Sequence, residues 1–388
     1  LVELQESEGY GLTITSDGGL VVLDGDGIAQ VLNVAASSNF SLTLRDVTVA
    51  NGIDVSGAGG AIFDVKSLKL DGVRFENNAG GAVYIYGDYS KGEQVEITDS
   101  HFEGNTGKPA FRQDGYYSPL VIANSTFVNN EGAILAHVNY SNASIFNSIF
   151  INNTDDGSVE SVSISGGAQE LKAVYNSLFH EQLAEAIAEE SVTALRFRSS
   201  TQNQVFNSVF LADAQVVSDV LIEVQNSYLD VSAIQGDAFK KNLMFTGAEP
   251  GFVDAENLNF ALGIDSDFID SGLSVETLFA TDILGAARIK GNSVDIGPYE
   301  SAEVKLSCFD GSDDLPDGPI EVANIQELRG AINRVIANGQ DDTIILANGT
   351  YDITEDGLGT IQFIDNESFK MTFKAAESGM AILDGAGA

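Results

Sequence analysis

Asn124-Ser125-Thr126-Phe127 is a four-residue phrase that returns along the first part of this chain with few changes. Close copies are Asn147-Ser148-Ile149-Phe150, Asn176-Ser177-Leu178-Phe179 and Asn207-Ser208-Val209-Phe210, and looser copies end at Phe102, Phe75 and Val49. The steps between the last residues of successive copies run from 23 to 31 residues. A repeat of this length is typical of a solenoid, in which each unit buries its apolar face against its neighbours.

The segments between the copies read as short strands. Ser41–Leu44, Val95–Ile97 and Val162–Ile164 alternate apolar and polar residues, as half-buried strands do. A repeat of about 25 residues holds roughly three such strands and three turns, so the pattern predicts an all-β, right-handed parallel β-helix. We expect the phenylalanines to stack inside it, and the Asn or Asp three residues earlier to form a hydrogen-bonded ladder in the turns.

Composition limits the partners and the setting. The chain has 388 residues, 40 glycines, 44% hydrophobic residues and a net charge of −38. This charge argues against nucleic acid and anionic lipid as partners, since both are bound through Lys and Arg. No apolar run is long enough to predict a membrane span. The single cysteine, Cys308, cannot form an internal disulfide, and such scarcity suits an extracellular prokaryotic protein.

The acidic residues fit two interpretations. One is a solvated coat that keeps a long molecule dispersed in salt. The other is a cation site, for which the best cluster lies in one short segment and consists of Asp310, Asp313, Asp314 and Asp317. Its carboxylates could wrap a hard ion such as Ca²⁺, although the spacing differs from that of an EF-hand loop.

The sequence predicts four regions. Residues 1–235 carry the coils, with a helical insertion at about 180–190, and residues 236–300 close the β-helix. An acidic linker follows at 301–323, and residues 324–388 form a cap helix and the first coils of a following β-helix. The predicted cap helix lies near 324–336, where Asn324 and Glu327 form a capping box and Leu328 and Ile332 share one apolar face. A strand at 341–346 and a turn at 347–351 come next.

Two of these regions resemble known families. The stretch from Asp282 to Glu300 contains a D-x-x-G-x-x-R motif that runs into V-D-I-G-P-Y-E. It resembles the closing signature of choice-of-anchor β-helix proteins of bacterial surfaces. The helix and strand at 324–346 resemble the N-terminal cap of pectate-lyase-like β-helices. These resemblances imply a repeat of a giant surface adhesin or fibre.

The two ends of the sequence also match each other. Ile382-Leu383-Asp384-Gly385 repeats Val22-Leu23-Asp24-Gly25, and Leu32-Asn33-Val34 repeats Val2-Glu3-Leu4. Joining Ala388 to Leu1 would therefore continue one coil. We expect the 388 residues to be one period of a tandem or polymeric array of copies placed head to tail. The residues expected at the junction are Leu1, Val2, Leu4, Leu328, Ile332, Ile382, Leu383 and Asp384.

An enzyme is the main alternative, because β-helices of this kind often cleave acidic polysaccharides. Asp155 and Arg288 lie in fragments similar to polygalacturonase motifs, but 133 residues separate them. That is about five coils, or roughly 24 Å along the axis, too far for one active site. We expect His101, His137 and His180 to be surface or turn residues, and Arg196 and Arg198 are candidate lyase bases by exclusion.

These observations favour a non-enzymatic, extracellular or cell-surface structural module without a catalytic site. The first alternative is a polysaccharide lyase or glycoside hydrolase. The second is a carbohydrate-binding surface protein that takes up surface glycans. Its exposed aromatic residues would be Tyr84, Tyr86, Tyr89, Tyr116 and Tyr117.

Overall fold

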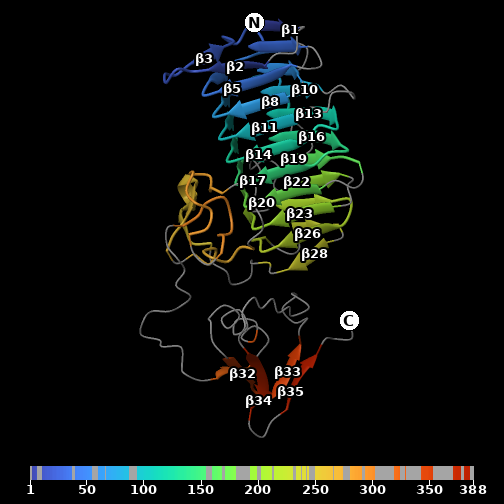
Figure 1. Ribbon diagram of the computed structural model, residues 1–388, viewed down its shortest axis with the longest axis vertical. Helices are drawn as coiled ribbons and strands as arrows, with labels where there is room; N and C mark the ends of the chain where they lie inside the picture. Colours follow the sequence, from blue (N-terminus) through green and yellow to red (C-terminus); the bar gives the residue numbers. More distant parts are fainter. Residues whose placement is uncertain are drawn as a thin grey trace. The chain divides into compact units, whose positions relative to one another are not determined.

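The computed structural model places most of the chain in short parallel strands (Figure 1). It describes all residues except 1, 7–10, 37–39, 55–59, 66, 87–93, 154–159, 168–170, 181–192, 199–201, 212–213, 230–232, 237, 242, 244–249, 265, 274–279, 291–292, 302–318, 324–327, 329–341, 353–369, 377–379 and 385–388. The described chain separates into two compact units, Leu1–Val304 and Lys305–Ala388.

The first unit is built from three parallel sheets that we call A, B and C. Sheet A has ten strands, which are β1 (Val2–Glu6), β4 (Leu32–Ala36), β7 (Ala61–Asp64), β10 (Val83–Tyr86), β13 (Phe111–Tyr116), β16 (Ile134–Asn139), β19 (Glu160–Ser165), β22 (Thr193–Arg198), β25 (Gln215–Ser218) and β27 (Ile234–Gln235). Sheet B has ten, which are β2 (Gly11–Thr15), β5 (Ser41–Arg45), β8 (Ser67–Asp71), β11 (Gln94–Thr98), β14 (Leu120–Ala123), β17 (Ala143–Phe146), β20 (Leu171–Tyr175), β23 (Gln202–Phe206), β26 (Ile222–Gln225) and β28 (Ala238–Lys241). Sheet C has eight, which are β3 (Val22–Asp24), β6 (Thr48–Ala50), β9 (Arg74–Glu76), β12 (His101–Glu103), β15 (Thr126–Val128), β18 (Ile149–Ile151), β21 (Leu178–His180) and β24 (Val209–Leu211).

Each coil contributes one strand to each sheet in the order A, B, C, which confirms the predicted all-β, right-handed parallel β-helix. The register explains why neighbouring coils share sequence. Val2, Glu3 and Leu4 pair with Leu32, Asn33 and Val34, the very match seen in the sequence. Likewise Phe102 pairs with Phe75 on one side and Phe127 on the other.

The repeated phenylalanines form a continuous stack, as predicted. Phe75, Phe102, Phe127, Phe150 and Phe179 are fully buried, and Phe210 is 2% exposed. Successive rings lie 4.5–5.2 Å apart and within 12° of parallel. Offset stacking of this kind adds to the burial of apolar area along the axis.

The serine of each phrase forms a second ladder that the sequence did not reveal. The Ser125 N–H donates to Ser148 Oγ at 3.3 Å, and the Ser148 N–H donates to Ser177 Oγ at 3.2 Å. Each of these hydroxyls also donates to the carbonyl two residues earlier; for Ser148 this is Phe146 O at 2.7 Å. The same pattern extends from Val73 to Ser227, so these buried turns satisfy their backbone donors from coil to coil.

Asparagines build two further ladders. The first residue of the phrase has a positive φ, 50° at Asn124 and 46° at Asn147, a conformation that Asn tolerates better than most residues. Asn147 Nδ2 donates to Asn124 Oδ1 at 3.2 Å, which confirms the predicted turn ladder. A second, buried ladder runs three residues after each phenylalanine. There Asn78 Nδ2 donates to Asn105 Oδ1 at 2.9 Å, and Asn130 Nδ2 to Asn153 Oδ1 at 2.8 Å.

The predicted closing region includes a compact segment, Gly251–Ser301, that we call the closing lobe. It contains the antiparallel pair β29 (Phe252–Asp254) and β30 (Asn259–Leu262) with the 3₁₀ turn η3 (Ala255–Asn257) between them. The lobe lies beside the solenoid and packs on the outer side of sheet C (Figure 1). It therefore covers a flank of the stack.

The second unit is a smaller parallel arrangement. One sheet contains β31 (Ile320–Val322), β32 (Asp342–Leu346) and β34 (Met371–Ala375), and another contains β33 (Gly349–Asp352) and β35 (Ala381–Asp384). The expected turn at 347–351 is wrong from Gly349 onward, because that stretch pairs with β35. The buried Tyr351 holds it by donating from Oη to Val322 O at 2.6 Å.

Parts of the predicted organisation lie outside the described residues. They include the helical insertion after His180, most of the acidic linker and, apart from Leu328, the predicted cap helix at 324–336. Leu328 is helical and buried. No helix in the described part of the chain is both long enough and apolar enough to cross a bilayer.

Candidate functional site: the buried network of the closing lobe

The closing lobe is attached to sheet C by an apolar interface. Ile149, Leu178 and Val209 point outward from β18, β21 and β24, yet they are at most 5% exposed because Phe260, Phe268 and Ile296 of the lobe cover them. Burying such side chains fully is worth about 1.5–3 kcal/mol each. The interface therefore holds the lobe firmly enough to position a polar centre.

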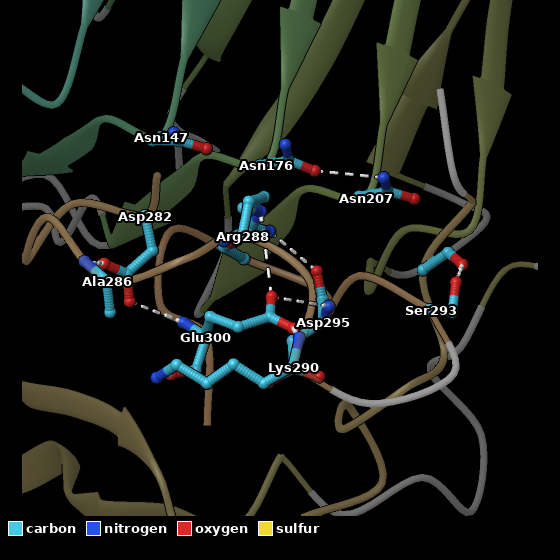
Figure 2. A network of polar contacts seen from close by, with 12 residues as sticks. Asn147, Asn176, Asn207, Asp282, Ala286, Arg288, Lys290, Ser293, Asp295 and Glu300 are labelled. Carbon is cyan, nitrogen blue, oxygen red and sulfur yellow. Dashed lines mark hydrogen bonds and ion pairs between the residues drawn. The ribbon is translucent and has the colours of Figure 1, made fainter. Parts of the chain in front are cut away.

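Arg288 lies at that centre and is 2% exposed. Its Nη2 donates to Asp295 O at 2.8 Å and to Gly297 O at 2.7 Å, and its Nε lies 3.8 Å from Glu300 Oε2 (Figure 2). The guanidinium thus fastens the last turn of the lobe through two backbone carbonyls. A side chain so enclosed cannot reach a polysaccharide, so the fragment resemblance that suggested a catalytic role for Arg288 finds no support in its position.

Three carboxylates surround Arg288 and bind backbone amides. Asp282 Oδ1 accepts from Leu284 N at 3.0 Å and Ala286 N at 2.8 Å, and its Oδ2 accepts from Glu300 N at 2.9 Å (Figure 2). Asp295 accepts from Asp270 N at 2.7 Å and from Ser301 N at 2.6 Å.

Glu300 accepts hydrogen bonds from Lys290 N at 3.3 Å and Asp295 N at 3.1 Å. Because every hydrogen bond here is made within the lobe, the centre works as a clasp.

The clasp holds more negative than positive charge, and this changes its titration. Burial, followed by the charge of Asp295, raises the pKa of Glu300 to about 7. Burial also raises the pKa of Asp295, while it lowers the pKa of Arg288 against the opposing effect of Glu300. Glu300 is therefore the group that takes up a proton as the pH falls from neutral.

The asparagines of the repeated phrase connect the solenoid to the lobe. Asn147 Nδ2 donates to Thr281 O at 2.7 Å, and Asn226 Nδ2 donates to Ser271 O at 3.1 Å. Asn207 makes a reciprocal pair with Leu273, donating at 2.9 Å and accepting at 2.7 Å. The same residues thus serve the turn ladder and the lobe, which places Thr281 beside the coil of Asn147. The expectation that Arg288 lies roughly 24 Å further along the axis is wrong, because the chain folds back.

Sequence reasoning missed the docking surface, although a signal was present. The third residue of the phrase points outward, and it changes from Arg74 and His101 to Ile149, Leu178 and Val209 along the stack. An apolar residue at this outward position predicts a cover on that side of the sheet.

The structure brings Arg196 and Arg198 together on the outer face of sheet A. Both pair with Glu160 Oε1, at 3.1 Å and 2.5 Å, and Arg196 also lies 3.5 Å from Asp219. The hydrogen bond to Glu160 is the main effect that raises the pKa of Arg198. A base for proton abstraction requires a lowered pKa, so the structure does not favour Arg198 in that role. Asp155 lies outside the described residues.

The three histidines all lie on strands. His101 bonds Thr126 Oγ1 at 2.5 Å and Glu103 at 3.1 Å, and His137 bonds Asp114 at 2.5 Å. His180 is partly covered by the lobe, 5.4 Å from the ring of Phe260, and burial lowers its pKa. They do not converge on one site, so the expectation of scattered histidines agrees with the structure, although none is in a turn.

The predicted Ca²⁺ ligands Asp310, Asp313, Asp314 and Asp317 lie outside the described residues, and within the described ranges no group of His, Cys, Asp and Glu is arranged to hold a metal.

Of the predicted junction residues, Val2 and Leu4 lie on β1, and Ile382, Leu383 and Asp384 lie on β35. Leu328 is buried in the second unit, and Leu1 and Ile332 are outside the described residues.

The aromatic residues proposed for glycan binding are divided. Tyr84 lies on the outer face of sheet A, and Tyr117 follows β13 with 55% exposure. Tyr86 and Tyr116 lie on described strands, and Tyr89 lies outside the described residues.

Comparisons with known proteins agree with this fold. The family model described as "Right handed beta helix region" matches residues 27–210. The chain carries a right-handed β-helix. Similar solved structures include pectate lyase Pel9A, at 11% identity and a TM-score of 0.30, covering 68% of this chain and 88% of that one. The PL6 family alginate lyase AlyGC matches at 11% identity and a TM-score of 0.28, covering 98% of this chain and 65% of that one. No curated protein matches the sequence.

Proposed function

We propose that this β-helix is a structural module of a cell surface or a secreted fibre, and that it extends by stacking head to tail on further copies. The observation that carries the proposal is a pair of free strand edges with exposed apolar side chains. One edge belongs to the first unit and the other to the second. Continuous ladders of Phe, Ser and Asn between the coils suit a load-bearing shaft, because every coil is bonded to the next.

The free edge of the first unit is formed by β1, β2 and β3, each paired with one strand only. Leu20, Val22 and Ile28 near this edge are 84%, 45% and 78% exposed. A row of open backbone groups beside apolar side chains is a template for another strand.

The free edge of the second unit is formed by β34 and β35. Met380, Ile382 and Leu383 are 69%, 43% and 55% exposed there. β35 carries the same Leu-Asp-Gly sequence as β3, and in both units a strand precedes it across a turn of similar length. An edge that resembles β3 would accept the strands of a next coil as the first unit's own coils do.

The proposed contact therefore pairs β35 of one copy with β3 of another, in parallel. The two surfaces are different, so the contact is heterologous and leads to a filament when it does not close into a ring. The net charge of −38 opposes the approach of copies. Assembly should consequently strengthen when salt screens the charges, at ionic strengths near or above roughly 0.15 M.

Sedimentation velocity across a range of protein and salt concentrations tests the proposal. We expect species larger than a monomer that grow with concentration, and filaments with a regular axial repeat by electron microscopy. Leu20→Asp and Leu383→Asp should each abolish growth, because each places a charge on one of the two edges. A mixture of these two variants should stop at dimers, since one intact edge remains on each.

Ile264→Asp is the matched control, because Ile264 is 68% exposed on the closing lobe, away from both edges. This variant should assemble like the parent chain. Dispersed monomers under all conditions, or growth that the edge variants leave unchanged, would defeat the proposal.

The likeness to choice-of-anchor proteins, the extracellular location and the Ca²⁺ site belong to the same proposal. They are supported by the Asp282–Glu300 motif, the scarcity of cysteine and the acidic segment at 310–317. The alternative of a polysaccharide lyase makes a separate prediction. Incubation with polygalacturonate or alginate would then yield unsaturated oligosaccharides, and we expect none.

A further inference from the structure

The outer face of sheet A carries a polar cluster on three adjacent strands. Asp114 on β13 accepts from Arg112 Nη2 at 2.6 Å, from Tyr84 Oη at 3.1 Å and from His137 Nδ1 at 2.5 Å. The Arg112 guanidinium also lies 4.9 Å from the centroid of the Tyr84 ring. These contacts fix a set of donors and acceptors on the surface, outside the closing lobe.

The strands β13 and β16 of this cluster both end in an exposed tyrosine. Tyr117 and Tyr140 are 55% and 52% exposed, and their rings stack at 5.3 Å with an angle of 19°. In the next coil Gly167 follows, and a Cβ there would come within 3.7 Å of the Tyr140 ring. The absence of a larger side chain at Gly167 leaves that side of the ring uncrowded.

Both tyrosines adopt an unfavourable backbone conformation. Their φ angles are 59° and 56°, in the left-handed region that bulky residues rarely enter. Such local strain persists where the surrounding structure enforces it, and it is concentrated at ligand-binding positions. The pair does not serve the core, because both side chains are exposed.

We propose that Tyr117 and Tyr140, together with the Asp114 cluster, bind an uncharged oligosaccharide. Aromatic faces stack on the C–H faces of sugar rings, while Arg112, Asp114 and His137 offer hydrogen bonds to hydroxyl groups. Five residues separate Arg112 from Tyr117, roughly 17 Å of extended strand, which is the scale of several sugar rings.

Charge selects a neutral glycan over an acidic one. Within the cluster the carboxylate of Asp114 offsets Arg112, and the chain as a whole carries −38. A polyanion would be repelled on approach and would find its cation already paired. This site is independent of the proposed assembly, because neither free strand edge contributes to it.

Tyr117→Gly and Tyr140→Gly test the proposal with a readout that separates binding from folding. Glycine adopts a positive φ without strain, so each variant should melt at the same temperature as the parent or slightly higher. The probes are cellohexaose and maltohexaose, with oligogalacturonate as the anionic comparison, followed by tyrosine fluorescence and calorimetry. We expect binding of at least one neutral probe, no binding of oligogalacturonate, and a loss of affinity of about tenfold in each variant.

Leu258→Gly is the matched control, because Leu258 has a φ of 60° and is 42% exposed on the closing lobe. It relieves the same strain and should leave binding unchanged. His137→Gln should weaken binding without changing the melting temperature by more than a few degrees. Preference for oligogalacturonate, binding of no probe, or a lower melting temperature with unchanged affinity in the tyrosine variants would each overturn the proposal.

Discussion

Sheet C has two halves that share one interior and differ in what covers them. In β9 and β12 the outward residues are Arg74, Glu76, His101 and Glu103, which are partly or fully exposed. In β18, β21 and β24 the corresponding residues include Ile149, Leu178 and Val209, which the closing lobe covers. The Phe stack and the Ser ladder run through both halves without a break. The coil is therefore specified by inward residues, and the cover is specified by outward ones.

The largest expected effect concerns the interior that both halves share. Phe150→Ala removes a fully buried ring that stacks on two neighbours, and it should lower the free energy of unfolding of the first unit by about 4 kcal/mol. Phe75→Ala, in the uncovered half, should cost nearly as much. Denaturant titration followed by circular dichroism measures both. A large loss for only one of them would show that the halves do not share their core.

Arg288→Met should act on the lobe alone. It leaves Asp282, Asp295 and Glu300 buried without a countercharge, which should destabilise the docked lobe by about 3 kcal/mol. Hydrogen exchange followed by mass spectrometry should show faster exchange in residues 251–300. The amides of β9 and β12 serve as the internal control, and faster exchange there as well would contradict a local clasp.

Val209→Thr converts a covered position to the chemistry of an uncovered one. The hydroxyl has nearly the size of the methyl group it replaces, so the loss of about 2 kcal/mol comes from burying an unpaired polar group. His101→Leu is the reverse change in the uncovered half and should alter stability by less than about 0.5 kcal/mol. Thermal unfolding of the two variants, with equal shifts, would show that the lobe does not discriminate between the halves.

Ser148→Ala interrupts the ladder beneath the lobe. The buried Ser125 N–H loses its acceptor, and the expected cost is about 1 kcal/mol. Ser100→Ala makes the same change in the uncovered half, where Val73 N donates to Ser100 Oγ, and should cost the same. A much larger effect in either half would mean that the ladder supports the cover as well as the coil.

The smallest effect is a dependence on pH that differs in sign between the two kinds of surface. The pKa of Glu300 is raised by burial from 4.5 to about 7, so its contribution is fully present below about pH 4.5 and is lost as the pH rises through 7. Protease protection of the lobe should fall over this range, and Glu300→Gln should remove the trend. A protection profile that rises over the same range would contradict the buried carboxyl.

The exposed sheet A offers the opposite case. Hydrogen bonding by His137 and the charge of Arg112 lower the pKa of Asp114 from 3.8 to about 2, although partial burial opposes them. Its contribution is present above about pH 3.8 and is lost as the pH falls toward 2.

Much of the shaft was predictable because its signals are local and repeated. A phrase such as Asn147-Ser148-Ile149-Phe150 fixes the coil length, the inward phenylalanine and the turn asparagine, since period and backbone preference act within one repeat. The Ser ladder was not predicted, because a serine in a turn has several local partners and only the neighbouring coil selects Ser177 Oγ for the Ser148 N–H.

The cover and the clasp depended on the tertiary structure. Thr281 and Asn147 are 134 residues apart in the chain, and counting coils between them gave a separation that the returning chain removes. The buried position of Arg288 and the raised pKa of Glu300 follow from that return, because desolvation requires a wall on every side. The sequence by itself determined a right-handed stack of coils, since each coil needs only its neighbours. Which face of the stack is closed, and which charged groups it encloses, was decided by contacts between distant residues.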